Sequence, residues 1–353
     1  MAYTTIDDPT IYFNTKLYTG NGTAIGSGGQ AITGVGFQPD WVWIKNRSSV
    51  VHHNVFDVIR GATNRIYTSS NSEEETFSES LTSFDSDGFT VGSNSAVNQN
   101  TSNHVAWNWK AGTSFSNDAS ATGIGTIDSA GSVSDTSGFS IVSWSGTGSN
   151  GTIKHGLSTV PKMIIVKSRS HSKDWTVYHS TLGNTKWIEL NAQTAEQSSS
   201  NRWNNTSPTS SVFTVATDSS VNASGYTYIA YCFAEKQGYS KFGSYTGNGN
   251  SDGTFIYLGF KPAWFLTKKS SASGNNWTLW DNKRDAKNPM DLLLHPNSSN
   301  AENDSGDNID FCSNGIKFRN TAGGGNASGA TYIYMAFAES PFVNSNGVPN
   351  NAR

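Results

Sequence analysis

One pattern occurs three times along the chain and limits what the chain can fold into. Each copy contains a glycine-rich turn, a proline followed by an apolar strand, a long polar stretch and an aromatic closing strand. The prolines that mark the copies are Pro39, Pro161 and Pro262. A period of about a hundred residues is typical of whole domains rather than of the short units of a solenoid.

The repeats predict how the chain divides. The expected segments are an N-terminal arm over residues 1–15, β-sandwich repeats over 16–112, 141–237 and 242–341, a linker over 113–140, and a C-terminal tail over 342–353. Residues 113–140 are nearly all Gly, Ser, Thr, Ala and Asp, a composition typical of flexible connections. The junction between the second and third repeats is short and partly apolar, so we expect these two to pack together and the first to be more loosely attached.

Composition predicts the fold class. The chain has 35 Gly, 12% aromatic and 14% charged residues, and no window keeps apolar residues at helical spacing beyond two turns. These features favour an all-β fold of three tandem β-sandwich domains. A unit of this length buries its own core without disulfides. Cys232 and Cys312 do not correspond between repeats, so we interpret them as buried thiols.

The strand after each proline is apolar on both faces. Residues 41–44, 163–166 and 264–266 are all apolar, although the side chains of a strand alternate between its two sides. Such a strand must be covered on both sides. One cover is the core of its own sandwich. The other is a loop of the same unit, a neighbouring unit or another copy of the chain.

Two recurring features have both a structural and a functional interpretation. Lys45, Lys167 and Lys268 each end the strand after the proline, either as a solubilising cap of the strand end, which we favour, or as an anion site. Trp175 and Trp277 begin the next strand, either as core residues, which we favour, or as a platform on which sugar rings stack.

The sequence contains no recognisable catalytic motif. The seven His residues are dispersed, and no Gly-x-Ser-x-Gly elbow or phosphate loop is present. The Tyr-Thr-Gly-Asn-Gly segments are typical of hairpin turns. Acidic clusters at 73–75 and 304–310 do not recur and are expected to be solvated. We predict a protein that is not an enzyme, without catalytic residues, metal site or cofactor, although partial calcium loops at 85–88 and 304–307 leave calcium as an alternative.

Charge and hydropathy exclude two classes of partner. The net charge is −3 and the Lys and Arg residues are scattered, which argues against nucleic-acid binding. The sequence contains no apolar run of transmembrane length, no signal peptide and no lipidation signal, so we expect no membrane insertion.

Several segments resemble a known family. They are residues 1–9 (MAYTTIDDP), the Tyr-Thr-Gly-Asn-Gly units at 18–22 and 245–249, residues 228–240 and residues 341–349. Together they are similar to virion-associated proteins of marine tailed bacteriophages with tandem concanavalin-type, lectin-like domains. The resemblance implies jelly-roll sandwiches and a protein of the virion that is made in the cytoplasm of the host bacterium. It supplies no site residues.

Two functions follow from this resemblance. The first is a tail-fibre or surface-appendage protein that attaches to host-surface glycans. The alternative is a decoration protein that stabilises the capsid or tail. Because residues 1–15 are too short for an attachment domain, the anchoring surface must lie on a sandwich or on this arm. We expect other virion proteins as partners, and further copies of the chain in a homotrimer that covers the apolar strands.

Binding is expected in the loops that differ most between the repeats, at about 68–103, 192–222 and 296–326. The best candidate there is Trp203, with Arg202, Asn204 and Asn205 around it. An aromatic face beside amide and guanidinium donors suits a sugar ring and its hydroxyls. The alternative is that Trp203 folds back and closes the end of its own core.

Overall fold

The structure is a computed structural model that describes residues 2–351. Strands make up 43% of the chain and helices 5%, and the strands form antiparallel sheets, which confirms the all-β prediction. Within residues 2–351, no helix is long and apolar enough to cross a membrane.

The elements fall into three consecutive units. Unit one contains η1 (Pro9–Ile11), β1 (Phe13–Thr19), η2 (Ile25–Ser27), β2 (Gln30–Thr33), β3 (Trp41–Asn46), β4 (Asn54–Asp57), β5 (Asn64–Tyr67), β6 (Glu75–Thr76), β7 (Leu81–Asp85), β8 (Gly88–Val91), α1 (Ser95–Asn98) and β9 (Asn103–Trp109). Unit two contains β10 (Thr113–Asn117), α2 (Ala119–Thr122), β11 (Ser129–Ser134), β12 (Phe139–Ser145), β13 (Gly151–Lys154), β14 (Met163–Ser168), β15 (Thr176–His179), β16 (Lys186–Glu189), β17 (Gln197–Ser198), α3 (Ser200–Trp203), β18 (Val212–Val215) and β19 (Thr227–Phe233). Unit three contains β20 (Ser240–Thr246), β21 (Phe255–Tyr257), β22 (Phe260–Lys269), β23 (Trp277–Asp281), β24 (Met290–Leu293), β25 (Asn303–Cys312), β26 (Gly315–Phe318) and β27 (Thr331–Pro341).

Each unit has an inner sheet with the same strand order. The shared orders are β1-β9-β3-β4 in unit one, β12-β19-β14-β15 in unit two and β20-β27-β22-β23 in unit three. A second, outer sheet accompanies each of them: β2-β8-β7, β13-β18 and β21-β26-β25-β24. Each unit also has its own buried apolar cluster, so each has a separate core.

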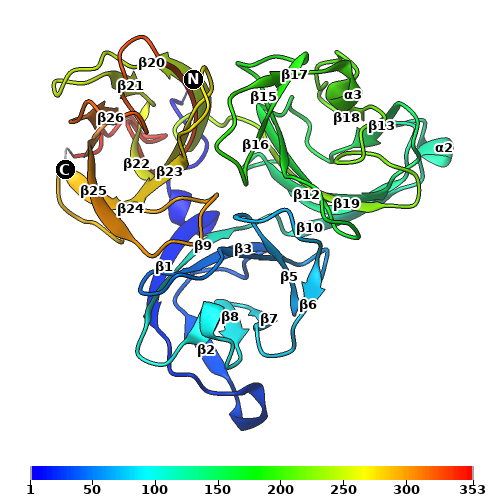
Figure 1. Cartoon of the computed structure of the whole chain (residues 1–353), viewed down its shortest axis with the longest axis horizontal. Coiled ribbons are helices and arrows are strands. Elements are labelled where there is room, and N and C mark those ends of the chain that lie inside the picture. Colours follow the sequence, from blue (N-terminus) through cyan, green and yellow to red (C-terminus); the bar gives the residue numbers. More distant parts are fainter. Residues whose placement is uncertain (1, 352–353) are drawn as a thin grey trace.

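The largest apolar cluster is shared by all three units. It contains residues from the face of each inner sheet that lies away from the unit's own core, among them Trp41, Tyr231 and Trp264. Figure 1 shows the units as three lobes around this common centre. The second cover of the two-sided apolar strands is therefore the neighbouring units. The expectation that unit one is loosely attached was wrong, because its strands β1, β3 and β9 contribute to the shared core.

The predicted linker over residues 113–140 is part of a sheet. β10 pairs with β11, and β11 pairs with β12, so these strands widen the inner sheet of unit two. Small residues make this close pairing possible, since a Cβ atom at Gly131 would lie 2.1 Å from the carbonyl oxygen of Ile141. The Gly and Ser content that indicated flexibility instead serves close packing.

The prolines mark the strand starts in two of the units. Pro39 and Pro161 lie two residues before β3 and β14, where a missing N–H costs no ladder bond. In unit three, β22 begins earlier, at Phe260, and the register shifts around Pro262. A bulge therefore accommodates this proline within a strand.

The Tyr-Thr-Gly-Asn-Gly segments do not form hairpins. β1 pairs with β9 and not with β2, so the turn after β1 carries the chain from the inner to the outer sheet. A buried asparagine holds each of these turns and the corresponding turn of unit two at 144–148: the Oδ1 atoms of Asn98, Asn222 and Asn326 accept N–H bonds of 2.8, 3.0 and 3.0 Å from Asn21, Thr147 and Asn248. The prediction of a hairpin missed this contact because its partner lies about 75 residues away in sequence.

The N-terminal arm packs against the rest of the chain. Ile6 is buried in the shared core, and the Thr4 hydroxyl donates to the carbonyl oxygen of Gln237 at 2.8 Å. The predicted arm over 1–15 ends earlier, because β1 begins at Phe13. Both ends of the described chain lie beside unit three (Figure 1).

Candidate functional site

Trp203 lies in the core of unit two. Its side chain is 2% exposed, its ring meets that of Tyr178 edge to face, and its Nε1–H donates to the carbonyl oxygen of Lys186 at 3.1 Å. The ring therefore presents no face to a sugar. This burial agrees with the alternative interpretation, in which Trp203 closes the end of its own core.

The neighbours of Trp203 are divided between core and surface. The guanidinium of Arg202 is mostly buried, lies 4.1 Å from the ring centre of Trp187 and pairs with Asp218. Asn204 and Asn205 are exposed and have positive φ angles of 49° and 50°. The structure therefore does not bring the four predicted residues together around one ligand. Glycan contact through the exposed amides stays a prediction.

The recurring lysines are buried, which corrects their interpretation as solubilising caps. Their Nζ atoms donate to backbone carbonyl oxygens: Lys45 to Ser299 at 3.2 Å, Lys167 to Asn71 at 3.1 Å and Lys268 to Asn275 at 2.7 Å. The first two of these bonds connect different units. Burial lowers the pKa of Lys45 to about 8, of Lys167 to about 7 and of Lys268 to about 8.

Trp175 and Trp277 also connect units. Each is 1% exposed, so the core interpretation was the better one. The Nε1–H of Trp175 donates to the carbonyl oxygen of Tyr67 in unit one, and that of Trp277 to the carbonyl oxygen of Glu189 in unit two, both at 2.8 Å. Their rings lie in the shared core and not beneath an outer sheet.

An ion network fills the contact between units one and two, which we call the one–two seam. Asp57 is fully buried, bonds Arg60 at 2.5 Å and accepts the Tyr231 hydroxyl of unit two at 2.7 Å. Glu74 bonds Arg169 of unit two at 2.9 Å and Arg60 at 3.4 Å. Glu74 is therefore structural, whereas the sequence suggested a solvated acidic cluster.

The contact between units three and one, the three–one seam, repeats this network. Asp281 bonds Arg284 at 2.5 Å and accepts the Nε1–H of Trp107 of unit one at 3.0 Å. Glu302 bonds Arg47 of unit one at 2.6 Å and Arg284 at 2.8 Å. The same four charges therefore occur in the same roles at two of the three seams.

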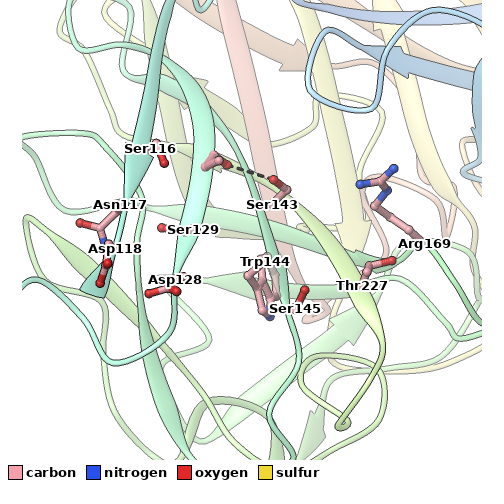
Figure 2. Close-up of a pocket in the computed structure, with 11 residues that line it drawn as sticks. Ser116, Asn117, Asp118, Asp128, Ser129, Ser143, Trp144, Ser145, Arg169 and Thr227 are labelled. Carbon is pink, nitrogen blue, oxygen red and sulfur yellow. Dashed lines mark hydrogen bonds between the residues drawn. The ribbon is translucent and has the colours of Figure 1, made fainter. Parts of the chain in front are cut away.

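A groove lies on the inner sheet of unit two, next to the one–two seam. Its volume is about 350 Å³. It is lined by Ser116, Asn117, Asp118, Asp128, Ser129, Ala130, Ser143, Trp144, Ser145, Arg169 and Thr227. Figure 2 shows Asp118 and Asp128 on one side, Arg169 on the other and Ser143 between them. We call this the seam groove.

The two aspartates are fixed by the short helix α2. The Asp118 carboxylate caps this helix and accepts N–H from Ala121 at 3.0 Å, and the Asp128 carboxylate accepts N–H from Ala119 at 2.8 Å. The hydroxyl of Ser120 lowers the pKa of Asp118, so this carboxylate is ionised at neutral pH. Each carboxylate keeps a second oxygen as an acceptor.

The seam groove offers acceptors on one rim, hydroxyls along the floor and a guanidinium on the other rim. Ser143 donates to the carbonyl oxygen of Ala130 at 3.1 Å, and its oxygen remains an acceptor. Arg169 is held by Glu74, with its side chain 25% exposed. This set of groups suits a polyhydroxylated ligand. Sequence reasoning missed the groove because residues 113–140 were interpreted as a linker, although Asp118 followed by Gly123 is a recognisable signal for a short capped helix.

The acidic residues of the described chain form no evident metal centre. Within residues 2–351, no group of three or more His, Cys, Asp or Glu side chains is arranged to hold a metal ion. Of the calcium-loop candidates, Asp85 accepts the Thr90 hydroxyl and Asp87 accepts N–H bonds from Gly34 and Gly36. The two carboxylates of the first of these loops thus have protein partners.

Comparison with known proteins gives a family. Residues 8–341 match the model of a domain of unknown function, DUF7483. The chain belongs to the DUF7483 family. No curated protein and no solved structure matches the chain. The match spans all three units, so the seam groove and all of the shared core except Ile6 lie within the matched region.

Proposed function

We propose that this member of the DUF7483 family is a virion structural protein of a tailed bacteriophage, built for attachment to host-surface glycans through a tail fibre or surface appendage. In this proposal each unit is a lectin-like β-sandwich of the jelly-roll type. The sequence resemblance to virion-associated phage proteins supports the first part. The inner and outer sheet of each unit, with a core between them, support the second.

The observation that carries glycan binding is the seam groove. Its volume lies at the lower end of the range of small-molecule sites. Most of its lining residues carry a hydroxyl, carboxylate or amide group, and they lie on strands and on a capped turn. Sugar hydroxyls donate to Asp118 and Asp128 and to the hydroxyl oxygen of Ser143, whose own proton is already bonded to Ala130. Weak binding at one such site gains strength when an appendage carries several copies of the chain.

A binding assay tests this proposal. Purified protein is applied to an array of bacterial-surface glycans, with the variant Ser143→Arg, whose long side chain fills the floor of the groove. Ser224→Arg is the matched control, because Ser224 is exposed in the same unit but does not line the groove. We expect the wild type and Ser224→Arg to bind the same glycans and Ser143→Arg to lose them. Equal binding by all three proteins, or no binding by folded wild type, contradicts the proposal.

A decoration role is the second candidate, and the shared core favours it. One chain closes three units around a common centre, which gives a rigid body suited to stabilising a particle surface. Antibodies against the chain, applied to intact particles, separate the two roles. Labelling of the tail or its fibres supports attachment, whereas labelling spread over the capsid supports decoration.

The expected homotrimer stays a prediction on a weaker basis. It rested on apolar strands in need of a second cover, and the neighbouring units of the same chain provide that cover. Light scattering of the purified protein measures the oligomeric state. A monomer at working concentration contradicts the trimer without affecting glycan binding.

A further inference from the structure

The contact between units two and three, the two–three seam, lacks the ion network of the other two. His179 stands where those seams have Asp57 and Asp281, Leu182 where they have Arg60 and Arg284, and Ser270 where they have Arg47 and Arg169. One part of the pattern is kept. The backbone N–H of Glu196 donates to the carbonyl oxygen of Ser270 at 2.9 Å, as Glu74 does to Arg169 and Glu302 to Arg47.

A cavity of about 270 Å³ lies at this seam. Its lining, drawn from both units, consists of Thr181, Leu182, Lys186, Glu196, Ser244, Ser270, Ser271, Thr331 and Ile333. Smaller side chains at two of the Arg positions therefore coincide with open space. The two–three seam has a cavity next to the position that Arg47 and Arg169 occupy at the other seams.

The lining has the mixed character of a sugar site. Five of its residues carry a hydroxyl group. The Ser271 Oγ accepts N–H from Thr331 at 3.1 Å, so its proton remains available to a ligand. Leu182, which is partly exposed, adds an aliphatic surface that suits the C–H face of a ring. Polar groups that fix orientation beside apolar groups that supply contact area are typical of small-molecule pockets.

The charges of the lining favour a neutral ligand. Glu196 pairs with Lys186, and their side chains are 25% and 38% exposed. The lining therefore has one negative and one positive charge, already opposed to each other. An anionic or cationic ligand would leave one charge unbalanced, whereas a neutral ligand accepts from the Lys186 ammonium and donates to the Glu196 carboxylate without disturbing the pair.

We infer that the cavity at the two–three seam binds a neutral monosaccharide unit, an inference that rests on the proposed glycan-binding function and adds a second subsite to it. Its ligand contacts both units, so binding bridges the seam. Ser270, which stands where the other seams have an arginine, is then a residue position that contributes to ligand recognition.

Saturation-transfer NMR tests this inference with single sugars as probes. Glucose, galactose, mannose and fucose are the neutral probes, and glucuronate and glucosamine are the charged ones. Ser270→Arg places at this seam the side chain that the other seams have. Ser244→Trp narrows the cavity from an exposed strand position and serves as a second variant if Ser270→Arg does not fold.

The expected result is transfer to at least one neutral sugar in the wild type, weaker transfer to the charged sugars, and loss of transfer in Ser270→Arg and Ser244→Trp. Ser143→Arg, which blocks the seam groove, is expected to keep the signal. Loss of the signal in Ser143→Arg alone overturns the inference and leaves the proposed function intact, because the sugar then binds in the groove. Transfer that persists in both cavity variants, or no transfer in folded wild type, also overturns it.

Discussion

The one–two and three–one seams differ from the two–three seam in how they bury charge. The first two each hold an Asp and an Arg that are fully buried, with a Glu and a second Arg that complete the network across the seam. The two–three seam has a neutral His, a Leu and a Ser at three of these positions, and its ion pair is partly exposed. The same backbone arrangement therefore tolerates both a charged and an uncharged filling.

This difference between the seams indicates where the stability of the fold depends on paired buried charges. Replacing a whole buried network by neutral residues is often neutral or stabilising, whereas removal of one partner leaves a buried charge unpaired. His179 illustrates the first case: burial lowers its pKa to about 4, and its Nε2–H donates to the carbonyl oxygen of Tyr334 in unit three at 3.1 Å. A seam without the network can thus still be well bonded. The charged seams are expected to be the sensitive ones.

The largest effect is expected from removal of a buried carboxylate. Asp57→Ala or Asp281→Ala leaves a fully buried guanidinium without its closest carboxylate, and we expect a loss of about 3–5 kcal/mol in the free energy of unfolding. His179→Ala at the corresponding position removes neutral hydrogen bonds, with an expected loss of about 1–3 kcal/mol. Urea denaturation measures all three. Asp252→Ala is the control, because that side chain is 81% exposed. Equal losses at Asp57 and His179 would contradict the comparison.

A smaller effect is expected from the bridging glutamates. Glu302→Gln weakens charged bonds to Arg47 and Arg284, and we expect a loss of about 1.5–3 kcal/mol. Glu196→Gln breaks a partly exposed pair with Lys186, for which about 0–1 kcal/mol is expected. Denaturation midpoints of the two variants give the difference, with the half-exposed Glu75→Gln as the matched control. A large loss for Glu196→Gln would mean that the two–three seam depends on its ion pair after all.

The repeat pattern was enough to predict the class of the fold and the strands that contain Lys45, Lys167 and Lys268, each of which runs one residue past the lysine, but not how the units meet. Two-sided apolar strands require a second cover, and sequence alone does not say which surface supplies it. The linker prediction failed at Gly131 and its neighbours for a related reason. In a sequence, glycine is read as a sign of a flexible connection, but here the absence of a side chain allows two strands to pair closely. Trp203 was chosen because its segment differs between the repeats, but differences between repeats do not report burial, and α3 packs this side chain into the core of unit two.

The buried lysines make stability depend on pH. Their pKa values are lower in the folded protein than in the unfolded chain, so the unfolded state binds more protons from about pH 7 upward and stability rises with pH over that range. Each lysine contributes at most about 1.4 kcal/mol per pH unit. We expect the free energy of unfolding of wild type to increase relative to Lys167→Met between about pH 7 and pH 9.5. Lys283→Met, at an exposed position, is the control. If the difference in unfolding free energy between wild type and Lys167→Met does not change with pH, burial does not lower the pKa of Lys167.

A small hydrogen-bond effect is expected at the tryptophans that connect the units, and here the two–three seam should behave like the one–two seam. Trp175→Phe and Trp277→Phe each remove one hydrogen bond of 2.8 Å to a carbonyl oxygen of the adjacent unit. We expect each to cost about 0.5–1.5 kcal/mol beyond the loss of ring size. Trp280→Phe provides that size correction, because Trp280 lies in unit three's own core and its Nε1 has no hydrogen-bond partner among the described residues. Thermal denaturation of the three variants measures the difference. One outcome would show that the two–three seam is open in solution: Trp277→Phe loses no more stability than Trp280→Phe, while Trp175→Phe loses clearly more. The cavity proposed as a sugar site is then part of a wider gap between units two and three.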